Sequence, residues 1–373
     1  FLLVRHLQEQ LMDLAKERFY GAKTERIDEI TVAASQPAGS YTWQLLDVAH
    51  GGVTDTYQVL ADDHSDRDQL NTEAGAQAWW DHRADFGQVH GDFVGTHAVP
   101  MGVEQSNTNL IVDDEWVVKV FRKLEDGLNP DVELLSVIVD CPNVAGVRGW
   151  LTRDGRTLAM MQQRIVGGVD GFDLARTTPD FADHARALGQ ATRTVHQALA
   201  DEFPTEQVST EAIVEKLHAH LDELLPQAEA LRAHEPAIRE LYDAAAGAGE
   251  ATIQRVHGDL HLGQTLFAER WYLIDFEGEP ARPLAQRVLP DHRLRDVAGM
   301  VRSFGYAAAM GGHGAEWERE MVDAYLDGAD ADAGALLAAY IVDKAAYEVA
   351  YEANNRPDWV QIPLKAITEL LQG

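Results

Sequence analysis

The chain has 373 residues, of which 46% are hydrophobic and 25% are charged. This composition is ordinary for globular proteins and excludes a wholly disordered chain. The sequence has 61 Asp and Glu residues against 31 Lys and Arg residues, which gives a formal net charge of −30. Such a charge repels phosphate backbones and anionic lipid headgroups, so we expect neither nucleic acid nor a membrane surface as a partner.

Other features of the sequence favour a cytoplasmic location. No apolar run approaches the ~20 residues needed to span a bilayer, and we identify no signal peptide. Cys141 is the only cysteine in the sequence, so no internal disulfide is possible, which suits a reducing compartment. We therefore expect a cytoplasmic protein, either a monomer or a weak homodimer, with two or three domains at roughly 150 residues per domain.

The first half of the chain is predicted to be rich in β-strands. A short helix is expected over 5–20, where leucines and Phe19 recur at helical spacing. Strands are expected over 41–48 and 54–60, because these β-prone runs lie between turn-rich segments. A further β-rich stretch covers 93–121 and contains a hairpin that turns at Asp113-Asp114-Glu115.

The second half is predicted to be mostly helical. Apolar residues repeat every three or four positions over 181–199, 213–224 and 337–351, which is typical of amphipathic helices. An insertion over 255–275 lacks this periodicity, and it contains a hairpin that turns at 268–270. This insertion also holds the densest group of polar residues, so we expect the chemistry of the protein there.

Three residues of the insertion indicate phosphoryl transfer. An acid at Asp259, an amide oxygen at Gln264 and an acid at Asp275, directly after an apolar strand, are the groups this chemistry uses. We expect Asp259 to orient an acceptor hydroxyl and take its proton, while Gln264 and Asp275 supply oxygen ligands for Mg²⁺. Protein kinases have the same spacing, with Asn in place of Gln and Asp-Phe-Gly in place of Asp275-Phe276-Glu277.

Two other interpretations of this segment remain open. Asp259 and His261 could simply bind backbone groups in a turn. Alternatively, His257, Asp259 and His261 could hold a transition metal in a metal-dependent hydrolase, since imidazole and carboxylate suit zinc. No further histidine cluster lies nearby in the sequence, and carboxylates dominate the segment. Both points favour phosphoryl transfer.

The phosphoryl-transfer hypothesis requires a lysine on an upstream strand and a glutamate on the next helix. Lys119 lies in a predicted strand and Glu133 lies in a helix predicted over 132–139. We therefore expect Lys119 to hold the nucleotide phosphates and Glu133 to hold Lys119. Residues 160–166 are predicted to form an apolar strand at the end of the β-rich part. We expect the backbone of this strand around Gln163 and Ile165 to contact the adenine of the nucleotide.

With these residues in hand, the sequence resembles the maltokinase-like branch of the aminoglycoside phosphotransferase family. The resemblance covers nearly the whole chain and is carried by several short motifs. These are residues 102–109, 119–122 and 127–131 in the first half, and residues 257–264, 275–280, 294–300 and 347–357 in the second half.

The resemblance implies an α+β, eukaryotic-protein-kinase-like bilobal fold with an N-terminal cap. It implies a cap over 1–92, a β-rich nucleotide-binding lobe over 93–166 and a helical catalytic lobe over 167–373. It also implies ATP as the phosphoryl donor, Mg²⁺ as the cofactor and a sugar hydroxyl as the small-molecule acceptor.

Departures from the maltokinase pattern bear on the acceptor. Maltokinases typically have Arg-Trp-Phe, two small residues and Lys-Gly-Arg near the N-terminus, where this chain has Arg18-Phe19-Tyr20-Gly21-Ala22-Lys23-Thr24-Glu25. Asn354 also stands where an arginine is common. Glucosamine kinases form a sister group in the family, and these departures fit that group better. We expect glucosamine as the acceptor, with formation of maltose 1-phosphate as the alternative.

The predicted acceptor pocket lies beside Asp259 and is rich in carboxylates. Lys344, Glu348 and Glu352 are spaced by four, so they share one helix face, which could be either a ladder of surface ion pairs or a polar wall of the pocket. An excess of carboxylate favours an acceptor that carries an ammonium group, and an aromatic side chain could support the sugar ring. The candidate substrate residues are His261, Glu279, Arg302, Glu348, Glu352 and Trp359.

Overall fold

The computed structural model describes residues 13–23, 25–102, 106–280, 282–332 and 334–371. These residues form two compact units. The first unit runs up to Val139 and includes Ala145–Ile165, and the second comprises Asp140–Val144 and the chain from Val166 onward. The predicted boundary between a cap and a β-rich lobe at residue 92 falls inside the first unit and stays a prediction.

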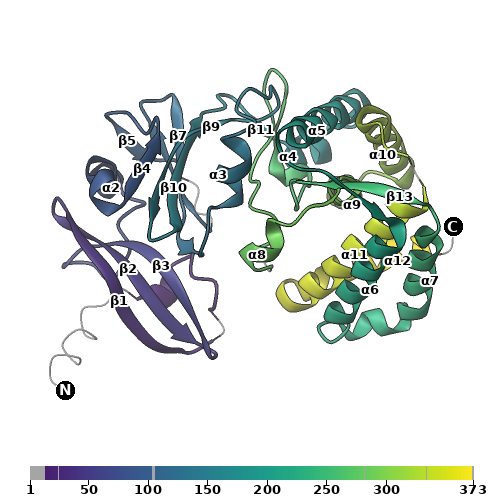
Figure 1. Ribbon diagram of the computed structural model, residues 1–373, viewed down its shortest axis with the longest axis horizontal. Helices are drawn as coiled ribbons and strands as arrows, with labels where there is room; N and C mark the ends of the chain where they lie inside the picture. Colours follow the sequence, from purple (N-terminus) through teal and green to yellow (C-terminus); the bar gives the residue numbers. More distant parts are fainter. Residues whose placement is uncertain (1–12, 24, 103–105, 281, 333, 372–373) are drawn as a thin grey trace. The chain divides into compact units, whose positions relative to one another are not determined.

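Over its described residues, the first unit consists of antiparallel strands, the helices α2 and α3 and one 3-10 turn (Figure 1). Its described strands form two sheets, with the orders β1-β2-β3-β8 and β4-β9-β10-β7-β6-β5. The elements are β1 (Ile27–Ala38), β2 (Tyr41–His50), β3 (Val53–Ala61), α2 (Glu73–Phe86), β4 (Gln88–Gly91), β5 (Ala98–Pro100), β6 (Thr108–Val112), β7 (Trp116–Val120), β8 (Lys123–Leu124), α3 (Pro130–Leu135), β9 (Val147–Arg153) and β10 (Arg156–Gln163).

Short turns with positive φ angles set the register of these strands. β2 and β3 are joined by Gly51 and Gly52, with φ of 51° and 83°, and β9 and β10 by Asp154 and Gly155, with φ of 50° and 78°. Two-residue hairpin turns of this kind match the twist of the strands and require residues that tolerate positive φ. Glycine and aspartate at these positions therefore fix the pairing of the strands.

The strand predictions are confirmed, but the first helix prediction is wrong over 13–20, the part that the structure describes. β2 and β3 cover the predicted strands, and β6 and β7 form the predicted hairpin. In the described part of the predicted helix over 5–20, Leu14–Lys16 form one turn of 3-10 helix, while Leu7 and Leu11 lie outside the described residues. Leu14, Phe19 and Tyr20 are buried in a cluster with side chains of β2 and β3, so packing against these strands accounts for the apolar residues of the described part.

A buried glutamine joins the two sheets of the first unit. Gln58 on β3 is fully buried, and its side-chain nitrogen donates hydrogen bonds to the backbone oxygens of Phe121 and Leu158, at 2.9 and 3.0 Å. Its side-chain oxygen accepts hydrogen bonds from the indole nitrogens of Trp43 and Trp79, at 2.8 and 3.2 Å. All four hydrogen-bonding positions of the amide are satisfied, which removes the penalty for burying it.

The first unit contains a histidine that should make its stability depend on pH. His50 Nδ1 lies 2.6 Å from a Glu25 oxygen, and Nε2 lies 3.0 Å from an Asp55 oxygen, and the hydrogen bonds to Glu25 and Asp55 raise the pKa of His50 above 6.5. A raised folded-state pKa gives stability that is complete below the unfolded-state pKa and is lost as pH rises through the folded-state pKa.

We therefore expect the unfolding temperature of the wild type to fall more, between pH 6 and pH 9, than that of a His50→Gln variant. Thermal unfolding followed by circular dichroism at both pH values measures this difference. His64→Gln, at an exposed histidine of the same unit, is the matched control and should follow the wild type. Equal falls for the wild type and His50→Gln would contradict the prediction.

The second unit is mostly helical, as predicted. Among its described residues, strands form two small sheets with the orders β11-β14-β15 and β12-β13-β16. The elements are β11 (Val169–Asp170), α4 (Gly171–Thr177), α5 (Ala182–Glu202), β12 (Glu206–Ser209), α6 (Thr210–Leu224), α7 (Glu235–Ala246), β13 (Glu250–Gln254), β14 (Thr265–Phe267), β15 (Trp271–Leu273), α8 (Leu284–Arg287), β16 (Asp291–His292), α9 (Leu294–Gly311), α10 (Ala315–Ala329), α11 (Ala335–Asn355) and α12 (Gln361–Leu370).

The packing of the second unit places α9 against both α10 and α11, while α10 lies along α5 (Figure 1). The predicted hairpin that turns at 268–270 is confirmed as β14 and β15, with Phe267 paired to Trp271. The helices predicted from apolar periodicity correspond to α5, α6 and α11. None of the helices in the described part of the chain is long and apolar enough to span a bilayer.

Candidate active site

A buried carboxylate on α9 fixes the loop that contains Asp259. Asp296 lies in the first turn of α9, and its two side-chain oxygens accept hydrogen bonds from the backbone N–H groups of His257 and Gly258, both at 2.9 Å. His196 Nε2, on α5, lies 2.8 Å from the same carboxylate. Burial opposes ionisation of Asp296, but the hydrogen bond from His196, the nearby charges of His196 and His257 and the hydrogen bond from the Gly258 N–H together outweigh it and lower the Asp296 pKa.

Two further residues on the same face of α9 hold the loop. Gly299 allows the helix to approach closely, because a Cβ atom there would lie 2.3 Å from the backbone oxygen of Leu260. Ser303 Oγ accepts a hydrogen bond from the N–H of Leu262 at 3.1 Å. Asp296, Gly299 and Ser303 are spaced by three and four residues, so one face of α9 fixes the loop.

His257 has a structural role in this loop. Its Nε2 donates to the backbone oxygen of Ile274 at 2.9 Å, and its Nδ1 accepts from the N–H of Asp259 at 3.4 Å. The carbonyl partner assigns the ring proton to Nε2. Both ring nitrogens therefore bind the backbone, and His257 is not available as a ligand for the zinc of the hydrolase alternative.

Asp259 is paired with a lysine from α11. Lys344 Nζ donates to Asp259 Oδ1 and to Glu279 Oε1, at 2.9 Å in each case. Burial alone would lower the pKa of Lys344, but the two carboxylates raise it, so Lys344 remains charged. Lys344 therefore fixes one oxygen of Asp259, and the contact of this carboxylate with an acceptor hydroxyl stays a prediction.

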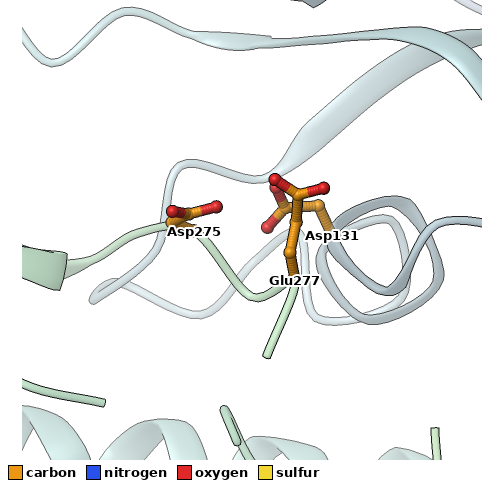
Figure 2. A group of neighbouring side chains, drawn as sticks. All are labelled: Asp131, Asp275 and Glu277. Carbon is orange, nitrogen blue, oxygen red and sulfur yellow. The ribbon is translucent and has the colours of Figure 1, made fainter. Parts of the chain in front are cut away.

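The predicted magnesium ligands lie together. Gln264 ends a short 3-10 helix, and its side-chain nitrogen donates to Asp275 Oδ2 at 3.0 Å, which brings the amide beside the carboxylate. Asp275 follows β15 and has a φ of 64°, a strained conformation for a residue other than glycine that is often found at functional sites. A carboxylate oxygen of Glu277 lies within 4.8 Å of one of Asp275, and both side chains are drawn in Figure 2.

These donors fit a magnesium ion. Gln264, Asp275 and Glu277 offer an amide oxygen and two carboxylates, and Mg²⁺ prefers oxygen ligands of this kind. Rotation of the Gln264 amide would exchange its nitrogen for its oxygen in the position facing Asp275. The sequence predicted only Gln264 and Asp275 as ligands. The structure adds the carboxylate of Glu277 to this candidate ligand set.

In the first unit, the lysine predicted for the nucleotide phosphates is held by an acid. Lys119 on β7 donates from Nζ to Asp131 Oδ2 at 2.7 Å, and the Asp131 side chain is fully buried. Asp131 lies in the first turn of α3, which begins at Pro130 because Asn129 caps it by accepting from the Asp131 N–H at 2.9 Å. The pairing with Glu133, two residues further along α3, stays a prediction.

The connector residues predicted to contact adenine lie at the end of the first unit. Gln163 is the last residue of β10 and pairs with Trp116 of β7. The Arg164 N–H donates to the backbone oxygen of Glu115 at 2.9 Å, so the chain is still tied to the hairpin there, directly before Ile165. The adenine contacts of Gln163 and Ile165 stay predictions. Within the motif over 102–109, residues 103–105 lie outside the described residues.

A cavity of about 630 Å³ opens beside Asp259 in the second unit. One wall is the face of α9 that carries Gly299, Ser303, Tyr306 and Met310, and the loop residue His261 also lines the cavity. Burial lowers the pKa of His261, which favours the neutral imidazole. A cavity of this size fits a small polar substrate with room for ordered water.

Another wall is the predicted face of α11. Lys344, Glu348 and Glu352 all line the cavity, as does Trp359 just beyond the helix, together with Tyr347, Tyr351 and Arg356. The helix-face prediction is therefore confirmed. The two glutamates are held by arginines: Glu348 accepts from Arg302, with the closer distance 2.9 Å, and Glu352 accepts from Arg356 at 2.6 and 2.8 Å.

Two predicted substrate residues do not line this cavity. Glu279 is almost fully buried and bonds Lys344, Arg282 and Arg295. Arg302 is buried behind Glu348. In this structure both side chains orient residues that line the cavity, and their direct contact with a substrate stays a prediction.

Comparison with known proteins identifies the family. Residues 97–337 match the model of the phosphotransferase enzyme family, which is more than half of the 373 residues. The chain belongs to this family. Among relatives, a glucosamine kinase of Streptacidiphilus jiangxiensis is 28% identical, with 72% of this chain and 72% of that protein covered. A glucosamine kinase of Mycolicibacterium smegmatis is 26% identical, with 73% of this chain and 79% of that protein covered.

Solved structures establish the fold of this phosphotransferase. A glucosamine kinase in crystal form B has a TM-score of 0.73 at 21% identity, covering 95% of this chain and 97% of that chain. A glucosamine kinase in complex with glucosamine, ADP and inorganic phosphate has a TM-score of 0.70 at 21% identity, covering 97% of each chain. The α+β, kinase-like fold expected from the sequence is confirmed.

Some residues that form or support the site of this phosphotransferase were not predicted from the sequence. Asp296 was noted only within a motif, although its hydrogen bonds fix the loop before Asp259. Asp170 and Asp173 line the cavity, and their signal was available, because Asp170 is the N-cap of α4 and accepts from the Asp173 N–H. Aspartate before a helix is a typical capping residue.

Proposed function

We propose that this phosphotransferase uses ATP to phosphorylate a hydroxyl group of an amino sugar, with glucosamine as the acceptor. The observation that carries the proposal is the charge of the cavity beside Asp259. Of the described residues that line it, five are carboxylates and two are cations, namely Asp170, Asp173, Asp259, Glu348 and Glu352 against Lys344 and Arg356. A cavity with this excess favours a ligand that carries a positive charge.

An ammonium group also needs partners when water is removed from it. A buried charge without a partner costs several kcal/mol, so an amino sugar requires carboxylates that a neutral sugar does not. The relatives named glucosamine kinase support this acceptor. In the opposite direction, Arg302 and Arg356 partly neutralise Glu348 and Glu352. That arrangement favours a neutral sugar and keeps maltose as the second candidate.

The residues of the chain divide the reaction between them. Asp259, held by Lys344, accepts the proton of the attacking hydroxyl while that oxygen bonds to the terminal phosphorus and ADP leaves. Lys119 holds the donor phosphates in this proposal, and Gln264, Asp275 and Glu277 hold magnesium. When bound, Mg²⁺ supplies positive charge that offsets the charge of the transferring phosphoryl group.

A coupled ADP-release assay with a panel of acceptors tests the proposal. We expect turnover with glucosamine that depends on added Mg²⁺ and stops with a chelator, and much lower kcat/KM with glucose and maltose. Glucose is the matched control, because it differs from glucosamine by one hydroxyl in place of the amine. Equal kcat/KM for glucosamine and glucose would remove the charge argument, and preference for maltose would select the second candidate.

A further inference from the structure

The second unit contains another cavity, of about 340 Å³, beside α6. Its walls come from α6, from the first turn of α9 and from the segment 278–291, which follows Glu277 and leads into α9. Among the described lining residues, it shares none with the cavity beside Asp259. The proposed phosphoryl transfer does not use this second cavity.

The charge of the second cavity is unusual for this protein. The sequence has about two acidic residues for each basic one, 61 against 31, but the charged lining residues described here favour cations. They are Lys216, Arg282, Arg287 and Arg295 against Glu223, Glu279 and Asp291. Several convergent cations in a concave site are what a compact anion such as phosphate requires.

Arg282 is placed to bind such an anion. Its Nε lies 2.8 Å from Glu279 Oε2, and its Nη2 donates to His220 Nε2 at 3.2 Å. His220 accepts there because its Nδ1 lies 2.8 Å from the Asp343 carboxylate, which places the ring proton on Nδ1. A guanidinium has five N–H groups, so Arg282 keeps donors beyond these two contacts.

Glu279 links this cavity to the loop that contains Asp259. Its Oε1 accepts from Lys344, the same ammonium group that holds Asp259, and its Oε2 accepts from Arg295 at 2.8 Å and pairs with Arg282. Lys344 is thus shared between the carboxylates of Asp259 and Glu279. The charge of Glu279 is also neutralised by Arg282 and Arg295, which line the second cavity. Any change in the arginines alters how Lys344 divides its bonds.

We propose that the second cavity binds a phosphate dianion, either inorganic phosphate or a phosphate monoester, and that this binding slows phosphoryl transfer. The anion attracts Arg282 and Arg295 away from Glu279. Glu279 then attracts Lys344 more strongly, and Asp259 loses part of the contact that orients it. Couplings between sites on one protein are typically about 5-fold or more, so we expect kcat to fall by roughly 5-fold at saturating anion.

Calorimetry tests binding without relying on the proposed function. Inorganic phosphate is titrated into the full chain saturated with Mg²⁺ and a non-hydrolysable ATP analogue, so that the nucleotide site does not take the anion. Lys216 on α6 lines the second cavity and is exposed. A Lys216→Gln change removes one charge, and we expect roughly 5-fold weaker phosphate binding.

The matched control is Lys365→Gln, which removes an exposed charge on α12 that lines neither cavity. We expect this variant to bind phosphate like the wild type and both variants to keep the turnover of the wild type. No phosphate binding in the presence of the nucleotide analogue, or equal weakening in both variants, would overturn the proposal.

The kinetic effect rests on the proposed function and is measured separately. At saturating ATP and glucosamine, phosphate should lower kcat in the wild type and in Lys365→Gln. In Lys216→Gln, a higher phosphate concentration should be needed for the same fall in kcat. The same measurement with glucosamine phosphate distinguishes a phosphate monoester from free phosphate. If Lys216→Gln weakens the inhibition of kcat by either ligand, that result supports the site. Binding without any change in kcat would overturn the coupling, and absence of turnover with amino sugars would refute only the proposed function.

Discussion

Replacing Asp259 with asparagine should lower kcat by roughly 10²- to 10⁴-fold, the usual contribution of general-base catalysis. The amide has the shape of the carboxylate, and its oxygen can still accept the hydrogen bond that Lys344 Nζ donates to Oδ1. The Asp259→Asn variant therefore keeps its place in the loop but cannot take the proton of the acceptor hydroxyl. Steady-state kinetics with glucosamine and ATP measure the loss.

Two controls separate this loss from misfolding. Affinity for Mg²⁺ and ATP should stay within a few fold of the wild type in Asp259→Asn, because the proposed magnesium ligands Gln264 and Asp275 are held by their own hydrogen bond. Asp243→Asn, at an exposed aspartate on α7 paired with His218, should leave kcat unchanged. Turnover of Asp259→Asn comparable to that of the wild type would show that another group accepts the proton.

The parts of the site that are local in sequence were predictable. Asp259, Gln264 and Asp275 lie within 17 residues of one another, so their spacing alone indicated one loop and one hairpin. The structure brings Gln264 and Asp275 into contact. The helical spacing of Lys344, Glu348 and Glu352 also predicted correctly that they share one wall. Helical and strand periodicity carries this local information directly.

Contacts between distant residues were not predictable in the same way. Asp296 and His196 are 100 residues apart, and Lys344 and Asp259 are 85 residues apart, yet each pair is in direct contact. Periodicity indicates which face of a helix is buried but not which carboxylate meets a given cation. The partner depends on how α5, α9 and α11 pack, which no single segment determines.

In the first unit, the partner of Lys119 likewise could not be predicted from local spacing. A lysine on a strand followed by an acidic helix was identified correctly from the sequence, but helix ends are set by capping and are hard to place within a turn. α3 begins at Pro130, so its first turn brings the buried carboxylate of Asp131 to Lys119, while the predicted pairing of Lys119 with Glu133 stays a prediction. Similarly, Leu14 and Phe19 are buried although the described residues around them do not form the predicted helix, because tertiary packing can bury apolar residues of any local structure.

Lys344→Met is expected to affect both stability and catalysis. Methionine keeps much of the volume of the lysine but removes the charge between Asp259 and Glu279. Leaving buried carboxylates without their partner costs about 3–5 kcal/mol, and unfolding in denaturant measures this cost. Asp259 also loses the contact that orients it, and misplacement by about 1 Å can cost 10²-fold in rate. We expect kcat to fall by roughly that factor.

A double variant separates the two effects. In Lys344→Met/Glu279→Gln, the charge of Glu279 is removed together with that of its partner, so part of the lost stability should return, since removing both members of a buried pair costs less than removing one. Asp259 still lacks its cation in the double variant, so kcat should stay low. Recovery of kcat together with stability would show that Lys344 only stabilises the fold, and kcat within two-fold of the wild type in Lys344→Met would exclude it as a positioning residue.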